Sequence, residues 1–140
     1  MVLKVKKLVP EAVIPKMATS GSAGMDLTAI TVHINSEGKY VYGTGLSFEI
    51  PKGYVGLLFP RSSIAKMDMT LSNCVGVIDS DFRGHVTFVF NVLDYGNKLY
   101  NVGDRIGQLV ILETPSISIE ETEDLSETER GGGGYGSTGR

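Results

Sequence analysis

The sequence predicts an all-β domain, built as an antiparallel sandwich, jelly roll or distorted barrel. Two observations support this prediction. Short segments rich in β-branched and aromatic residues partly alternate between apolar and polar positions. Turn-forming residues separate these segments at intervals of about eight to twelve residues, a spacing typical of sandwiches and barrels.

The expected strands are, in order, LKVKKLV (3–9), YVYGTGLSFEI (40–50), YVGLLF (54–59), HVTFVFNVL (85–93) and GQLVILE (107–113). Turns are expected at PKG (51–53), DYGN (94–97) and NVGD (101–104). The best helical segment is short, RSSIAKM at 61–67. Two apolar runs flank DSDFRG (79–84). This pattern predicts a hairpin whose connecting turn carries these polar residues.

Length and cysteine content restrict the class of protein. A chain of 140 residues is expected to form one domain with a modest core, which oligomerisation would help to stabilise. The single cysteine, Cys74, excludes an internal disulfide framework and a cysteine-based zinc cluster. The sequence contains no run of about 18 apolar residues, so no membrane span is predicted. We therefore expect a soluble cytoplasmic protein, or a nuclear one in a eukaryote, that is not secreted.

Charge divides the chain into three parts. Residues 1–119 form a β-rich body with 11 Lys and Arg against 10 Asp and Glu, without the broad basic face of a protein that binds duplex nucleic acid. Residues 120–129 carry six acids and no base, which predicts a solvated, self-repelling linker. Residues 130–140, RGGGGYGSTGR, form a glycine-rich tail that cannot pack by itself.

The tail permits several interpretations. It nearly matches a phosphate-binding P-loop, but the lysine is missing, and neither a preceding strand nor a following helix is expected. Its glycines still expose backbone N–H groups, and Arg130, Ser137 and Thr138 add donors for an anion. Tyr135 offers a ring that can stack on a base. The alternative is a glycine-rich terminus without fixed structure.

Two stretches of the body suggest catalysis on an anion. In PRSSIA (60–65), a guanidinium and two hydroxyls open a helical stretch, which indicates an anion site or, alternatively, an N-cap with a surface arginine. Asp79 follows the apolar run VGVI, so a partly desolvated carboxylate at a strand end can act as a general base. The alternative is that Asp79 or Asp81 makes an Asx-turn.

Other polar residues are less specific. Asp26, among small and apolar residues, can orient an arginine or a metal-bound water, or it can end a strand. Gln108 interrupts an apolar run and needs a partner. Asp104 and Arg105 are interpreted as a local ion pair. Cys74 is interpreted as a small core residue. The two histidines, His33 and His85, lack metal-ligand spacing.

The stretches AGMDL, PRSS, GVIDSDFRG, GDRIGQL and RGGGGYGSTG occur in this order across residues 23–139 and closely resemble the five motifs of the trimeric dUTP pyrophosphatase (dUTPase) family. The resemblance implies a dUTPase-like jelly-roll homotrimer with three Mg²⁺-dependent sites at subunit interfaces. Water would attack the α-phosphorus of dUTP and give dUMP and pyrophosphate. This reaction keeps uracil out of DNA and supplies dUMP for thymidylate synthesis.

The resemblance also implies a role for each matching residue. Asp79 would activate the water, and Asp26 would support the metal through waters. The phosphates would be bound by Arg61, Ser62, Ser63, Gln108, Arg130, Ser137 and Thr138. Uracil and deoxyribose would be bound by Asn73, Val75, Gly76, Val77, Ile78, Phe82 and Tyr135. The tail would close on its own subunit's site or on a neighbour's.

Three positions depart from the family pattern. Phe82 stands where tyrosine is usual beneath the deoxyribose, Tyr135 replaces the usual phenylalanine of the tail, and Met25 occupies an often aromatic site. A related family with the same fold, dCTP deaminase, has a glutamate where this chain has Val89, which disfavours deamination. An interaction protein that binds regulatory partners is a further alternative, although no inserted segment indicates one. An RNA-binding tail would need repeated RGG units, and one is present.

Overall fold

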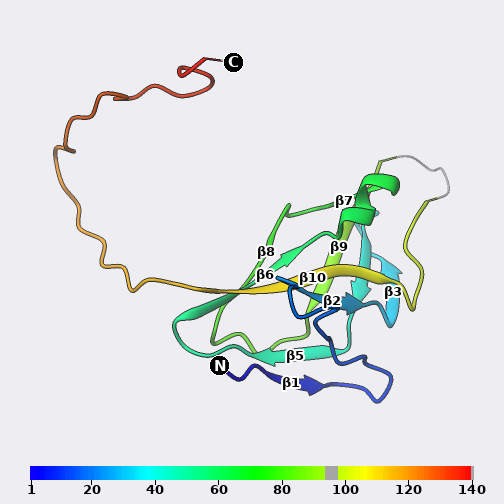
Figure 1. Cartoon of the computed structure of the whole chain (residues 1–140). Coiled ribbons are helices and arrows are strands. Elements are labelled where there is room, and N and C mark those ends of the chain that lie inside the picture. Colours follow the sequence, from blue (N-terminus) through cyan, green and yellow to red (C-terminus); the bar gives the residue numbers. More distant parts are fainter. Residues whose placement is uncertain (94–97, 140) are drawn as a thin grey trace.

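The computed structural model describes residues 1–93 and 98–139, which contain ten strands and one short 3-10 helix (Figure 1). The first strands are β1 (Lys4–Lys7), β2 (Met25–Thr28), β3 (Thr31–Ile34), β4 (Tyr40–Gly43), β5 (Leu46–Glu49) and β6 (Tyr54–Phe59). The 3-10 helix η1 (Ser62–Lys66) follows, and then β7 (Met69–Leu71), β8 (Gly76–Ile78), β9 (Thr87–Val92) and β10 (Arg105–Glu113). The prediction of an all-β domain is confirmed.

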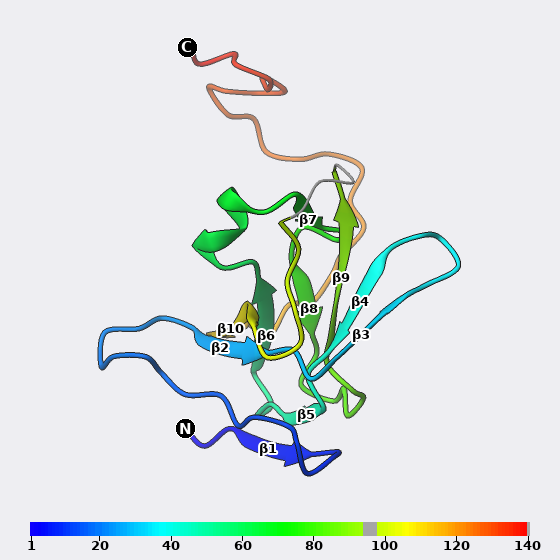
Figure 2. The same cartoon turned by 90° about the vertical axis from the view of Figure 1, so that its right-hand side faces the viewer.

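The strands form three antiparallel sheets. One four-stranded sheet has the order β2-β10-β6-β8, and the other has the order β3-β4-β9-β7. A two-stranded sheet pairs β1 with β5. Within the described residues the sheets do not close into a barrel, and their arrangement fits a jelly roll. Figure 2 shows η1 beside β7, at the end of the body opposite to β1.

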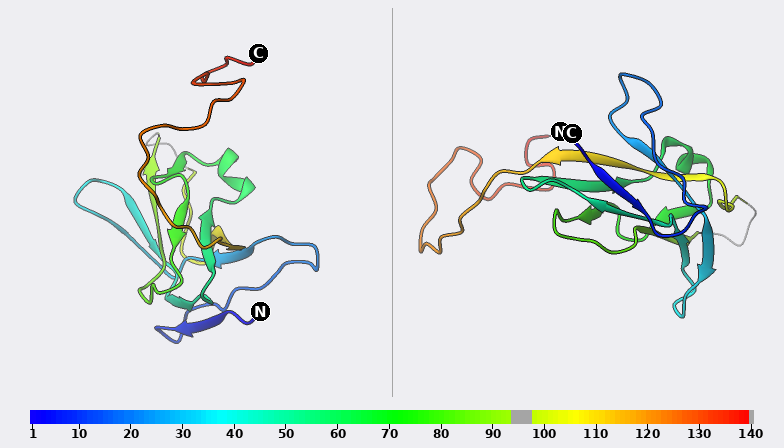
Figure 3. Two further views of the ribbon diagram at one scale, coloured as in Figure 1. Left: turned by 90° about the vertical axis from the view of Figure 1, so that its left-hand side faces the viewer. Right: turned by 90° about the horizontal axis from the view of Figure 1, so that it is seen from below.

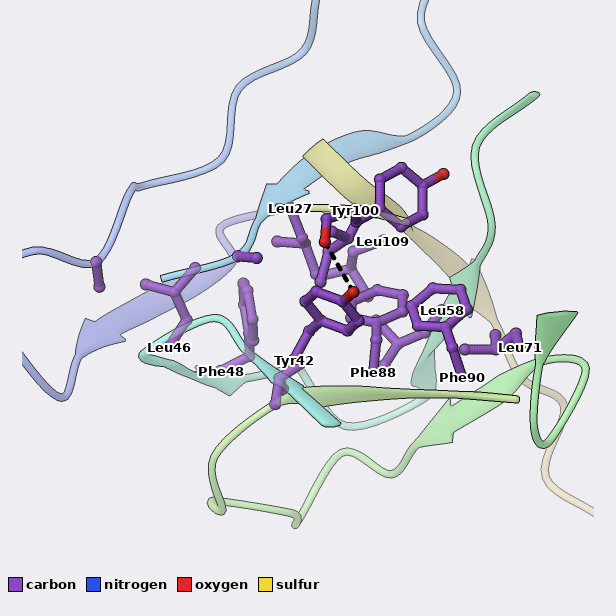
Figure 4. Packing of buried hydrophobic residues seen from close by; sticks show 14 of the residues in the cluster. Leu27, Tyr42, Leu46, Phe48, Leu58, Leu71, Phe88, Phe90, Tyr100 and Leu109 are labelled. Atoms are coloured by element: carbon purple, nitrogen blue, oxygen red, sulfur yellow. Dashed lines mark hydrogen bonds between the residues drawn. The ribbon is translucent and has the colours of Figure 1, made fainter. Parts of the chain in front are cut away.

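The core lies between the two four-stranded sheets. Leu27, Leu58 and Leu109 come from the first sheet and meet Phe88 and Phe90 of the second (Figure 4). All five side chains are buried. Burial of one such side chain contributes about 1.5–3 kcal/mol, so this layer holds both sheets in place.

Two tyrosines connect this core with the segment around η1. Tyr42 is fully buried on β4, and its hydroxyl donates a 2.8 Å hydrogen bond to the backbone oxygen of Tyr100 (Figure 4). The Tyr42 ring meets the rings of Phe90 and Tyr100 edge-on. The hydrogen bond satisfies a phenol that would be costly to bury alone.

Most of the expected strands are confirmed. Segments 3–9, 54–59 and 85–93 contain β1, β6 and β9, and segment 107–113 lies within β10. The segment 40–50 instead divides into β4 and β5, which belong to different sheets. Gly45 explains the division, because its φ of +68° redirects the chain in a conformation that side chains disfavour. The alternation of apolar residues continues through this turn and therefore conceals it.

The expected hairpin around DSDFRG is wrong. β8 pairs with β6, whereas β9 pairs with β4 and β7 in the other sheet. The segment between them crosses from one sheet to the other. A turn signal between two apolar runs does not specify their partners, and here each run pairs with a strand that lies elsewhere in the sequence.

The expected helix and two expected turns are confirmed. The helix appears as η1. Tyr54 N–H donates to the Pro51 oxygen at 3.1 Å, and Asp104 N–H donates to the Asn101 oxygen at 3.0 Å. Gly53 and Gly103 adopt positive φ in these turns. The turn expected at 94–97 lies outside the described residues.

The chain beyond β10 runs away from the body. In Figure 3 the orange-to-red segment leaves the sheets in both views. Residues 114–139 contain no strand, and nearly all of them are exposed. The division into a body, an acidic linker and a tail stays a prediction. In the part of the chain that the structure describes, no helix is long and apolar enough to cross a membrane.

Candidate functional site

Three segments of the sequence meet beside Asp26 in the first sheet. Asp26 on β2 lies opposite Gln108 on β10, and Gln108 lies opposite Phe59 at the end of β6. The chain then continues through Pro60 into Arg61 and η1. Antiparallel pairing through β10 therefore brings together the polar residues of AGMDL, PRSS and GDRIGQL.

Asp26 is held between two arginines. Arg61 Nε donates to Asp26 Oδ1 at 2.8 Å, and Arg105 Nη1 donates to Oδ2 at 2.9 Å. The side chains of Asp26 and Arg61 are 22% and 25% exposed, whereas that of Arg105 is 57% exposed. Two guanidinium groups against one carboxylate leave the cluster positively charged. Since each guanidinium has five N–H donors, both retain donors for an anion.

Gln108 has the partner that its position requires. Its side-chain Nε2 donates a 3.1 Å hydrogen bond to the backbone oxygen of Pro60, directly before Arg61. Its Oε1 lies against Gly24, where an added Cβ would approach this oxygen to 2.7 Å. This packing fixes the amide at the base of the segment that leads into η1.

The serines of PRSS occupy the start of η1. Ser63 Oγ lies 3.2 Å from the hydroxyl of Tyr100, which is buried, and Ser62 is exposed. Arg61 occupies the N-cap position without making a side-chain cap, and it binds Asp26 instead of pointing into solvent. The interpretation as an N-cap with a surface arginine is therefore wrong.

Asp79 begins a turn whose backbone is firmly held. Phe82 N–H donates to the Asp79 oxygen at 3.1 Å. Arg83 Nη1 donates to the backbone oxygens of Ser80 and Phe82 at 2.7 and 3.0 Å. Asp79 is exposed in the single chain, so the expected partial desolvation is not met. The 79–82 turn closes through backbone atoms, without an Asx hydrogen bond from Asp79 or Asp81.

Asp79 and the Asp26 cluster lie at different levels of the first sheet. Gln108 lies opposite Phe59, whereas Ile78, which precedes Asp79, lies opposite Gly56. Three residues of β6 separate these levels, which corresponds to about 10 Å along the strand. One chain therefore does not bring its Asp79 carboxylate next to its own cluster.

A hollow lies between the sheets at the loop that joins β7 to β8. Its volume is about 260 Å³, below the range of roughly 300–1,000 Å³ for pockets that enclose drug-sized ligands. It therefore suits a single small ring better than a whole nucleotide. Its lining includes Asn73 and Gly76 of the predicted uracil site, together with Leu58, Leu71, Ser72, Thr87, Phe88 and Val89.

The other residues predicted to bind uracil lie around this hollow or beyond it. Val75 N–H contacts the Asn73 oxygen at 2.6 Å, so both residues belong to one tight turn. On β8, Val77 is 62% exposed and Ile78 is partly buried. Phe82 is 41% exposed and follows β8 by four residues.

The tail gathers its own polar residues. Arg130, Ser137 and Thr138 line a hollow of about 520 Å³ with Thr128, Glu129 and Gly133. Arg130 Nε donates to the Gly133 oxygen at 2.9 Å. Tyr135 is fully exposed. The structure does not bring these residues to the body.

Metal ligands are sparse. Within residues 1–93 and 98–139, no three His, Cys, Asp or Glu side chains gather into a metal-binding group. Asp26 offers a carboxylate at the positive cluster, but both of its oxygens already accept from arginines. This donor set suits a hydrated cation that is carried mainly by the phosphates of a ligand.

Sequence reasoning missed three residues that shape the site. Arg105 was expected to form an ion pair with Asp104, but it binds Asp26. Asp104 Oδ2 instead accepts a 2.7 Å hydrogen bond from Asn101 N–H. The hydroxyl of Tyr100 positions Ser63. The guanidinium of Arg83 holds the 79–82 turn through the Ser80 oxygen. The sequence contains no signal for Arg105, because the register of β10 shifts between Arg105 and Gly107, and simple alternation from Gln108 would place residue 105 on the other face of the sheet.

The interpretation of Cys74 is also wrong. Cys74 is exposed and has φ +59°, because it lies in the turn between β7 and β8 instead of on a strand. His85, to which no role was assigned, accepts a 2.8 Å hydrogen bond at Nε2 from the Gly45 N–H.

Comparison with known proteins extends these observations. A family model described as dUTPase matches residues 10–139. The chain is 43% identical over 144 residues to the deoxyuridine 5'-triphosphate nucleotidohydrolase of Nautilia profundicola, with all of both chains covered. It is 40% identical to the protein of the same name from Corynebacterium glutamicum, over 99% of this chain and 95% of the relative.

Solved structures agree in fold. The dUTPase of Staphylococcus bacteriophage 80alpha, solved with dUPNHPP, superposes with a TM-score of 0.84 and 26% identity over 99% of both chains. A mutant dUTPase from phage phi11 of S. aureus, described with a structural Mg(II) ion, superposes with a TM-score of 0.75 and 22% identity over 89% of this chain and 98% of the other.

Proposed function

The chain belongs to the dUTPase family and hydrolyses dUTP, and we propose that it does so by attack of a water molecule on the α-phosphorus. The observation that best supports a site for the triphosphate is the Asp26 cluster, in which Arg61 and Gln108 meet. dUMP and pyrophosphate are the products. The reaction keeps uracil out of DNA and supplies dUMP for thymidylate synthesis.

In this proposal the body binds the phosphates through PRSS and Gln108. Arg61, fixed through Nε, keeps its terminal nitrogens for phosphate oxygens. Ser62 and Ser63 add hydroxyl donors, and Ser63 is positioned by Tyr100. Preorganised donors of this kind stabilise the charge that develops on the leaving pyrophosphate, because they need no reorientation during the reaction.

Asp79 acts as the general base. Its carboxylate accepts a proton from water while the water oxygen bonds to the α-phosphorus. The bond from that phosphorus to the bridging oxygen then breaks, and pyrophosphate leaves. The 79–82 turn supports this role, because its backbone hydrogen bonds hold Asp79 at the end of β8.

Asn73 and the backbone from Val75 to Ile78 recognise uracil. The hollow between the sheets supports this assignment, since Asn73 and Gly76 line it and its volume suits one ring. Phe82 lies under the deoxyribose. Its ring excludes a 2′-hydroxyl by contact alone, because phenylalanine cannot donate a hydrogen bond to the sugar.

The enzyme works as a homotrimer with sites at the subunit interfaces. The separation of Asp79 from the Asp26 cluster supports this, because a site that needs both must take them from different chains. The tail, residues 130–140, closes the site: Tyr135 stacks on uracil, and Arg130, Ser137 and Thr138 bind phosphates. The linker, residues 120–129, keeps the tail extended until substrate binds.

Mg²⁺ is the proposed metal. It would be held mainly by the substrate phosphates and by water, with Asp26 as the nearby carboxylate. When bound, it neutralises charge on the phosphate oxygens. The enzyme is placed with its substrate in the cytoplasm, or in the nucleus of a eukaryotic cell.

A hydrolysis panel tests the function. The full-length chain is incubated with dUTP, dCTP, dTTP or UTP, with and without Mg²⁺, and pyrophosphate and ammonia are measured. We expect pyrophosphate from dUTP alone, with a strong requirement for Mg²⁺. Ammonia released from dCTP would instead indicate a deaminase.

A further inference from the structure

The Phe82 ring lies directly on Gly84. A Cβ added at Gly84 would lie 2.4 Å from Phe82 Cζ, 2.8 Å from Cε2 and 3.2 Å from Cε1. These three ring atoms are the nearest neighbours of the missing side chain. The position therefore accommodates no side chain while the ring stays where it is.

We infer that Gly84 is a specificity-determining position that places the Phe82 ring against the sugar of the substrate. The inference rests on the proposed function, in which Phe82 lies under the deoxyribose. Phenylalanine lacks the hydroxyl usual at this position of the family. Discrimination against a 2′-hydroxyl then depends only on where the ring lies, and the ring lies there because residue 84 has no side chain.

A methyl group at residue 84 would move the ring and not the backbone. Carbon atoms in contact normally lie about 3.5–4.0 Å apart, so 2.4 Å is an overlap of more than an ångström. The backbone beneath is held by the Phe82 N–H bond to Asp79 and by two bonds from Arg83. Phe82 as a whole is 41% exposed in the single chain, so its ring has space to turn outward.

The backbone of Gly84 tolerates alanine. Gly84 is not among the glycines with positive φ, so the substitution introduces no strain of that kind. Gly21 provides a matched control, because it also lacks positive φ and no atom lies within 4 Å of its added Cβ. Gly84→Ala and Gly21→Ala make the same chemical change and differ in the presence of the ring.

The test compares dUTP with UTP. kcat and KM are measured for both nucleotides with the full-length wild type, Gly84→Ala, Gly21→Ala, Phe82→Ala and the double variant Phe82→Ala/Gly84→Ala. For Gly84→Ala we expect a higher KM for dUTP and a ratio of dUTP to UTP kcat/KM that falls about tenfold or more, the scale of discrimination by apolar contact. Gly21→Ala should keep the wild-type ratio.

The double variant separates an effect through the ring from any other effect. If Gly84 acts only through Phe82, the double variant has the ratio of Phe82→Ala alone. Two results would overturn the inference. One is a double variant in which the effects of the two single substitutions on the ratio of dUTP to UTP kcat/KM multiply. The other is a ratio for Gly84→Ala that stays within twofold of the wild-type ratio. A wild type that does not cleave dUTP would refute the proposed function instead.

Protein stability provides a second readout if Gly84→Ala folds poorly. Thermal unfolding is measured for the same set of variants. The ring contact predicts that Gly84→Ala lowers the melting temperature when Phe82 is present and leaves it unchanged in the Phe82→Ala background. An equal loss in both backgrounds would overturn the inference.

Discussion

Tyr42→Phe is expected to reverse its effect on stability as pH rises. Burial of the phenol raises the pKa of Tyr42 to about 12, and the charges of Tyr40, Asp104 and Tyr100 act in the same direction. The unfolded chain titrates near the ordinary value of 10.0. Between these values the unfolded state loses its proton first, so the stability due to Tyr42 is complete below pH 10 and is lost toward pH 12.

The magnitude follows from the size of the shift. One pKa unit corresponds to about 1.4 kcal/mol, so the wild type loses about 3 kcal/mol of unfolding free energy from this group in full, of which about 2 kcal/mol is lost between pH 10 and 12. About half of the loss has occurred by pH 11. At pH 8, phenylalanine costs about 1–2 kcal/mol, because the Tyr100 oxygen loses its 2.8 Å hydrogen bond. The wild type is therefore more stable at pH 8, and the two curves cross near pH 11.

Urea unfolding of both proteins, at equal protein concentration and at half-unit steps from pH 8 to 11.5, measures this difference. Ionisable groups that do not interact with Tyr42 are common to both proteins, so their titration cancels in the difference. A difference in unfolding free energy that stays constant from pH 8 to 11.5 would refute the reasoning. It would mean that the Tyr42 phenol ionises as readily in the folded state as in the unfolded state.

Three further predictions concern the site. Asp79→Asn should lower kcat by about 10²–10⁴-fold with little change in KM for dUTP, and near-normal turnover would exclude Asp79 as the base. Deletion of residues 130–140 should abolish most activity while the melting temperature and the oligomeric state by light scattering stay unchanged; full activity would contradict closure by the tail. Arg105→Met should raise KM for dUTP several-fold, because the cluster loses one positive charge and Asp26 then binds Arg61 alone. Arg105→Lys should recover part of this loss. Equal kinetics of both variants would show that the charge of residue 105 does not cause the change in KM.

The strands could be predicted where the pattern of apolar residues along the sequence shows which side chains are buried. β6 and β10 were predicted closely, because their apolar residues face one core and turn residues bound them. β3 was missed because it has only four residues, and its alternating Val32 and Ile34, both exposed in the single chain, form too short a pattern to predict a strand. The pairing of β8 was predicted wrongly because β8 takes its partner, β6, from a distant part of the sequence, and local patterns do not encode that choice.

The site residues were likewise predicted where a local motif contains them and missed where strand pairing brings them together. The motifs identified Asp26, Arg61 and Gln108, and the structure joins them through the register of β2, β10 and β6. The role of Arg105 depended on that register, since residues 26 and 105 are far apart in the sequence. Asp79 is exposed in the single chain, and the apolar run that precedes it contains no sign of that exposure.

The charge of the cluster gives a physical reason for the proposed closure by the tail. Arg61 and Arg105 exceed Asp26 by one positive charge, whereas a triphosphate carries several negative charges. A partly exposed pair of guanidinium groups is screened by water and cannot balance that charge alone. In the proposed mechanism, Mg²⁺ and Arg130 would supply the remainder when substrate binds. The site would then be complete only in the closed complex, and the phosphates that are to be cleaved would also hold it closed.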